Sequence, residues 1–352
     1  MSVIGIIRTL RKLFRWTEVF LSRRSHAAAL LVCCFTLALI SEDSSAEDSP
    51  KSFQVKDEDT QLAQRFAVRE SVESPFEYSL SAGYRRDNMS WSIAYGGIDV
   101  ASEVSWKKTV IAQLRAAAKL NLGSDWLLRG IYTTGAVKSG RNQDSDYAGS
   151  NRTQEFSRSD NKTGGAVRDV SIGLGRNIRL FDLESGGAMY VAPLAGLSIH
   201  QQSLTMYDGI QTIPVNGGAI TGLHNSYDTQ WKGSWLGMDA LLGLGGNILL
   251  NSTVEYHWVD YSAEANWNLR SDFAHPVSFR HVAKGRGVLV SVGGSYRFSR
   301  NFLMKTALEQ QKWNTYTGYD QTNFSYGATN YYTLNPVSWN STAFSLVAVY
   351  QF

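Results

Sequence analysis

Long segments of alternating polarity fill the chain from Phe76 to Phe352. Between residues 288 and 298, one set of alternate positions is apolar, aromatic or glycine, and the intervening set holds serine, glycine and Arg297 beside Leu289. The same alternation recurs over 302–309. A period of two residues is typical of a β-strand with two different faces. Because lipid offers the backbone no hydrogen-bond partner, an apolar-out, polar-in sheet in a membrane must close into a barrel.

The length of the apolar runs supports this interpretation. No stretch of 18 or more consecutive apolar residues occurs in the chain, which excludes helical membrane spans. The sequence therefore predicts an all-β fold, a ten-stranded antiparallel transmembrane β-barrel of the outer membrane. With ten strands, the lumen is expected to be filled largely by side chains, which argues against a general diffusion pore.

Turn-forming residues divide the barrel region into strands and connectors. Four connectors are predicted to be long loops on the extracellular side, namely 140–165, 208–224, 263–278 and 320–335. The connectors 122–125, 181–187, 245–247 and 299–301 are short, as periplasmic turns are. Pro193 conflicts with its strand, because proline cannot donate a hydrogen bond to a neighbouring strand. The ten predicted strands are 76–95, 100–121, 126–139, 166–180, 188–207, 225–244, 248–262, 279–298, 302–319 and 336–352.

The N-terminal residues predict export. A positively charged stretch with Arg8, Arg11, Lys12, Arg15, Arg23 and Arg24 precedes the apolar run 27–40, and small residues at 44–46 suit a cleavage site. We interpret 1–46 as a signal peptide, 47–75 as a polar periplasmic leader and 76–352 as the barrel. A retained membrane anchor is the alternative for 1–46.

Cleavage after residue 46 would change the composition. It would remove Cys33 and Cys34, the two cysteines of the chain, and with them any disulfide or thiolate metal site. It would leave equal numbers of basic and acidic residues, so nucleic acid is not an expected partner.

The last strand carries a further signal. Phe344, Leu346, Ala348, Tyr350 and Phe352 share one face, although Val347 and Val349 interrupt the polar face opposite. A strand ending in an aromatic residue is similar to the terminal signal of Gram-negative outer-membrane barrels. It predicts contact with the barrel-assembly machinery through Phe352. A soluble β-sandwich is the alternative for this alternation.

Two carboxylates stand out after the strand 126–139. Asp144 and Asp146 are separated by Ser145, and on extended backbone such residues point to the same face. Two adjacent carboxylates can hold a water between them or share a proton. A plain solvated loop rich in Asp, Asn and Ser is the alternative.

The strand number and the element Asp144-Ser145-Asp146-Tyr147 together resemble the omptin family of outer-membrane endopeptidases, which carry an Asp-x-Asp-aromatic motif at this point. The segments that carry the likeness lie in order along about 280 residues, namely 101–107, 143–158, 234–237 and 255–259. The resemblance implies a cell-surface endopeptidase in which the aspartates position a water and a histidine acts as the base.

The resemblance implies a second couple, Asp272 and His275, after strand seven. The family pattern there is Asp-x-His, whereas this chain has Asp-x-x-His. The predicted catalytic residues are therefore Asp144, Asp146, Asp272 and His275. His281, His257 and His224 are weaker candidates for the base.

Other departures concern specificity. The positions matching the family's acidic pocket, near Met89 and Ser271, are not acidic, and the segment 195–201 lacks the family's lipopolysaccharide-binding residues. We expect peptide or protein substrates, contact with outer-membrane lipid, and neither a cofactor nor a metal. Dependence on lipopolysaccharide stays open. The two alternatives are a catalytically altered barrel that binds host surfaces or polymers, and a substrate-specific channel.

Overall fold

The computed structural model describes residues 74–352 except 124, 184–186 and 245–246. The predicted signal peptide lies outside the described residues, as does the leader apart from its last two positions. In the described part of the chain, no helix is long and apolar enough to cross a membrane.

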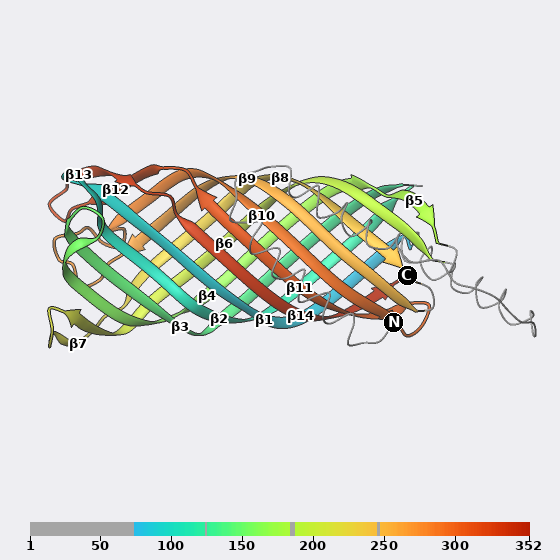
Figure 1. Cartoon of the computed structure of the whole chain (residues 1–352), viewed down its shortest axis with the longest axis horizontal. Helices are drawn as coiled ribbons and strands as arrows, with labels where there is room; N and C mark the ends of the chain where they lie inside the picture. Colours follow the sequence, from blue (N-terminus) through green and yellow to red (C-terminus); the bar gives the residue numbers. More distant parts are fainter. Residues whose placement is uncertain (1–73, 124, 184–186, 245–246) are drawn as a thin grey trace, which may run out of the picture. The chain divides into compact units, whose positions relative to one another are not determined.

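Ten antiparallel strands close into a ring, as predicted (Figure 1). Each strand pairs with the next in the ring, and β14 pairs with β1 to close it, with Tyr78 opposite Tyr350. The fold is therefore an all-β barrel. The ring strands are β1 (Phe76–Tyr95), β2 (Ile98–Leu122), β3 (Trp126–Gly149), β4 (Thr153–Arg176), β6 (Ala188–Ile213), β8 (Asn225–Gly243), β9 (Ile248–Asn266), β10 (Phe279–Arg297), β11 (Phe302–Thr315) and β14 (Ser338–Gln351).

Four short strands extend the ring. β5 (Ile178–Asp182) and β7 (Gly218–Ile220) pair with β6. The hairpin of β12 (Gly318–Asn323) and β13 (Thr329–Leu334) fills the gap between β10 and β1 beyond the ends of β11 and β14. We call the end of the barrel that carries β7, β12 and β13 the mouth; the C-terminus lies at the other end (Figure 1).

The prediction of a long loop over 140–165 is wrong. β3 continues to Gly149 and β4 begins at Thr153, so the polar segment is a paired β-hairpin with a tight turn. The regions 208–224 and 320–335 likewise contain strands. Polarity misled the prediction because strands that extend beyond the lipid need no apolar outer face, whereas their backbone pairing continues.

The structure explains Pro193. On one side of β6, residues from Leu194 onward pair with β4, and residues up to Val191 pair with β5. Pro193 lies between these two stretches, where one neighbouring strand ends and the next begins. The missing N–H of proline therefore costs no ladder hydrogen bond on that side.

A continuous apolar band surrounds the end of the barrel opposite the mouth. Its outward side chains are large, apolar and exposed, which suits contact with lipid. Toward the mouth the same outward positions become polar, for example Arg168, two residues from Val170 on β4, and Arg86, two residues from Tyr84 on β1. Members of the band include Leu80, Tyr84, Leu114, Tyr132, Val170, Ile172, Leu174, Leu197, Leu236, Leu250, Val292, Tyr296, Phe344 and Leu346.

Ion pairs and tryptophans fill the lumen. Arg129 contacts both Asp239, at 2.7 Å, and Glu255. Arg85 contacts Asp87 at 2.7 Å and Asp169 at 2.8 Å, and Arg115 contacts Glu309 at 2.9 Å. The stacked rings of Trp313 and Trp339, with centroids 5.3 Å apart, lie beside them and are fully buried. The side chains therefore occupy the interior as the strand number predicts.

Candidate functional site

The predicted aspartates lie inside β3, near the mouth. Asp144 pairs across the sheet with Val104, which is fully buried, and Asp146 pairs with Ser102. Their positions two apart on a paired strand place both carboxyl groups on one face, as predicted. The site therefore has a rigid sheet as its floor rather than a loop.

Burial raises the pKa of both carboxyl groups. Burial, followed by the charge of Asp146, raises the pKa of Asp144 to about 7. Burial also raises the pKa of Asp146, although hydrogen bonds from Ser102 and Ser157 oppose the change. Asp144 therefore changes its protonation state near neutral pH, in the range where a carboxyl group can act as either acid or base.

Trp267 faces the aspartate pair from across the mouth. Its indole Nε1 donates a hydrogen bond to Asp144 Oδ2 at 3.2 Å. Its ring packs on Phe279 at 4.7 Å and on Trp91 at 6.3 Å, and its backbone N–H donates to Ser278 Oγ at 2.9 Å. Trp267 is thus a fixed, largely buried donor to Asp144, directly after the end of β9.

Arg270 brings a positive charge to the same region. Its charge lowers the pKa of both Asp144 and Asp146, yet its guanidinium is hydrogen-bonded to Asp272 at 2.9 and 2.7 Å. The guanidinium also lies over the ring of Phe273, 4.2 Å from its centroid. The hydrogen bond from Arg270 is the main reason why the pKa of Asp272 is lowered.

The predicted couple of Asp272 and His275 does not form. The carboxylate of Asp272 is occupied by Arg270, and His275 Nδ1 lies 2.6 Å from Asn266 Oδ1. His275 Nε2 lies 3.2 Å from the backbone oxygen of Arg270. The extra residue between Asp272 and His275 explains the correction, because the segment forms a turn that directs the two side chains to different partners.

The weaker histidine candidates are also engaged elsewhere. His281 is fully buried, burial lowers its pKa to about 3, and its Nδ1 is 2.7 Å from the hydroxyl of Tyr227. His257 lies in the lumen beside Glu255, with its Nε2 3.0 Å from Oε2. His224 is exposed on the loop before β8. Neither Asp144 nor Asp146 is hydrogen-bonded to a histidine within the part of the chain that the structure describes.

Trp267 and Arg270 were not predicted as site residues. A signal for Trp267 exists, because Ala263, Ala265 and Trp267 continue the lumen-facing alternation of β9. Arg270 lies in a turn, where no periodicity applies. Among residues 74–352 as described, no group of three or more His, Cys, Asp and Glu side chains could hold a metal ion.

Comparison with protein-family models shows which family the barrel belongs to. The model of the family described as Protochlamydia outer membrane protein matches residues 79–352, that is, the barrel itself. The chain belongs to this family. Membership places the protein in the outer membrane, in agreement with the apolar band. No curated protein matches the sequence.

Two solved structures that are similar to this chain are outer-membrane proteins. The outer-membrane protease OmpT of Escherichia coli has a TM-score of 0.66 and 14% identity, covering 80% of this chain and 98% of its own. The outer-membrane protein OprG of Pseudomonas aeruginosa has a TM-score of 0.34 and 11% identity, covering 79% and 97%. The likeness to an omptin is therefore one of fold, and omptin membership does not follow from it.

Proposed function

We propose that this protein is a surface-binding barrel whose mouth holds a cationic group of its ligand against Asp144 and Asp146. The observation that carries the proposal is the hydrogen bond from Trp267 Nε1 to Asp144 Oδ2. In the omptin-like hypothesis a histidine base serves the aspartate pair. Here the group hydrogen-bonded to Asp144 is an indole, whose N–H cannot accept a proton and so cannot act as a base.

The surroundings of the pair suit binding. The aromatic rings of Trp267, Trp91 and Phe279 pack together beside the pair, and aromatic rings attract cations when water is excluded. The adjacent carboxylates supply the opposite charge. Arg270, held by Asp272 and Phe273, limits the net negative charge of the mouth in the absence of a ligand.

A binding experiment tests this function. We expect a fluorescein-labelled oligolysine peptide to bind the refolded barrel at pH 8, as measured by fluorescence anisotropy, and to bind more weakly at pH 6. The sign follows from Asp144, whose pKa of about 7 means that it gains a proton as the pH falls.

The double variant D144N/D146N should lose most of this binding. The matched control is D260N, which removes a carboxylate from the exposed pair with Lys284 on the outer surface. Equal losses in both variants would show that binding depends on general charge and would reject the mouth as the site.

A second candidate function is peptide hydrolysis by the aspartate pair alone. It is favoured by the raised pKa of Asp144 and Asp146, because one protonated and one ionised carboxyl group can together activate a water. Cleavage of a quenched fluorescent peptide library should then disappear in D144N and persist in H275A. Loss of cleavage in H275A would restore the catalytic role first predicted for His275.

The channel hypothesis finds no support in the lumen, where the tryptophans and the arginine ion pairs are buried together. Discrete conductance steps of the purified protein in a planar bilayer would revive it.

A further inference from the structure

The hairpin β12–β13 presents an uncharged aromatic face to the outside. Tyr319 and Gln321 point outward from β12, and Tyr331, opposite Gln321, points outward from β13. The acidic residue of the hairpin, Asp320, points inward and is fully buried. The outward face therefore combines aromatic rings and amide groups without a charge.

The two tyrosine rings form an open platform. Their centroids are 6.0 Å apart with a T-shaped arrangement, and 44% of Tyr319 and 66% of Tyr331 is exposed. Gln321 Nε2 donates to Asn323 Oδ1 at 3.1 Å, which fixes the amide beside the rings. Exposed aromatic residues on a rigid, paired hairpin cost little entropy on binding.

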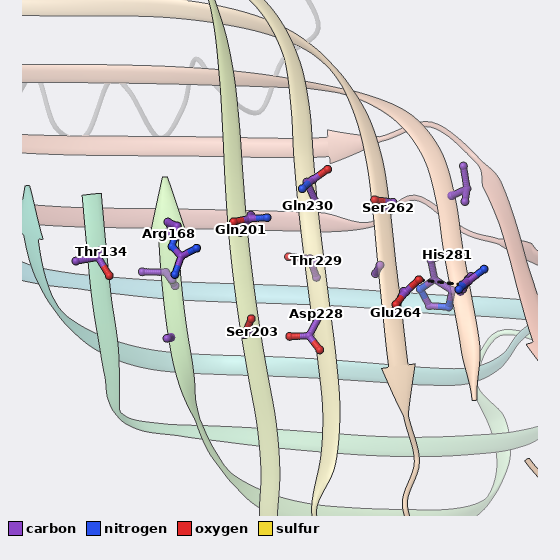
Figure 2. Close-up of a pocket in the computed structure, with 15 residues that line it drawn as sticks. Thr134, Arg168, Gln201, Ser203, Asp228, Thr229, Gln230, Ser262, Glu264 and His281 are labelled. Carbon is purple, nitrogen blue, oxygen red and sulfur yellow. Dashed lines mark ion pairs between the residues drawn. The ribbon is translucent and has the colours of Figure 1, made fainter. Parts of the chain in front are cut away.

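A hollow in the outer surface of the barrel continues this platform. Its volume is about 520 Å³, and it is lined by residues of β3, β4, β6, β8, β9 and β10. Figure 2 shows Thr134, Arg168, Gln201 and Gln230 side by side on neighbouring strands. Val282, at the edge of the hollow, is in register with Tyr319, so the hollow and the tyrosine platform form one surface.

The charges in the hollow cancel. The lining contains two basic side chains, Arg168 and Arg280, and two acidic ones, Asp228 and Glu264. Arg280 is already paired with Glu264, at 3.0 Å. One cation of the lining, Arg168, is left for an anionic group, whereas a phosphate-rich ligand needs several, so the surface suits a neutral ligand better than a phosphorylated lipid headgroup.

We propose that this combined surface binds a neutral oligosaccharide from outside the cell. A sugar ring offers an apolar C–H face, which stacks on Tyr319 and Tyr331, and hydroxyl groups, which bond to the amides of Gln201, Gln230 and Gln321. The volume of the hollow lies in the range of small-ligand pockets. This site is separate from Asp144 and Asp146 and does not depend on the function proposed for them.

The test is binding to a panel of neutral oligosaccharides, followed by calorimetric titration of the strongest one. The barrel should be refolded in a phosphocholine detergent, because maltoside detergents carry competing sugars. We expect Y331A and Y319A each to raise the Kd about tenfold, which corresponds to ~1.4 kcal/mol. Y331F should bind within about twofold of the unmodified protein, because it keeps the ring.

Two controls separate the surface from its surroundings. Y326A removes the ring of an exposed tyrosine at the hairpin tip, where it stacks on Phe324, and should leave the Kd unchanged. D144N/D146N should also leave it unchanged, so failure at the mouth and failure here are distinguishable. Any of three results would overturn the proposal. They are no binding of any neutral sugar, an unchanged Kd in both tyrosine-to-alanine variants, and binding of lipopolysaccharide micelles that is tighter than binding of the neutral sugars.

Discussion

Replacing Asp144 by asparagine should stabilise the barrel at alkaline pH. In the folded protein the pKa of Asp144 is raised to about 7 from 3.8, its ordinary value. This difference corresponds to ~4 kcal/mol of unfavourable free energy when the carboxyl group is ionised. Asp144 is only half-buried, so solvent reduces the penalty, and we expect about 2 kcal/mol. Asparagine keeps an oxygen that accepts the Trp267 hydrogen bond and has no charge.

The pH dependence has a definite sign. A carboxyl group with a raised folded-state pKa favours the folded state fully below its unfolded-state pKa and loses this contribution as the pH rises. The stability gained in D144N should therefore be near zero below pH 4, grow between pH 4 and 7, and be complete above pH 8.

Denaturant unfolding in detergent micelles, followed by tryptophan fluorescence at pH 4, 6 and 8, measures the difference. The control is D260N, because Asp260 is exposed and pairs with Lys284 at the surface, where a charge contributes little. A D144N variant no more stable than the unmodified protein at pH 8, or equally stabilised at pH 4, would refute the argument.

Three further predictions concern other parts of the barrel. W267F removes the indole donor to Asp144, so the pKa of Asp144 should rise further, as observed by carboxyl ¹³C NMR titration; an unchanged pKa would exclude the hydrogen bond. R129M leaves the carboxylates of Glu255 and Asp239 without their cation and should lower the free energy of unfolding by about 3–5 kcal/mol. K284M at the surface should lower it by under ~1 kcal/mol in the same unfolding assay. F352A should lower the amount of assembled barrel in cells without changing the stability of refolded protein, if the terminal ring is read by the assembly machinery; normal assembly would contradict this role.

The site shows how far sequence reasoning extends. The same-face placement of Asp144 and Asp146 follows from their spacing alone, because neighbouring side chains alternate on a strand. The partner of the pair did not follow. His275 has the right chemistry, but a turn directs it to Asn266, and Trp267 takes the contact with Asp144. Turn geometry and contacts between distant strands have no periodic signature, so they are visible only in the folded chain.

The alternation of apolar and polar residues determined the barrel, its ten strands and its place in a membrane, because lipid permits only a sheet that closes. It also placed most strand ends within a few residues. Tertiary structure alone decided how far the strands rise above the apolar band, since polar residues on a paired hairpin resemble those of a loop. It also brought Trp267 and Arg270 to the aspartates and joined the hollow to Tyr319 and Tyr331. These contacts join residues far apart in sequence, and the closure of the ring fixes them.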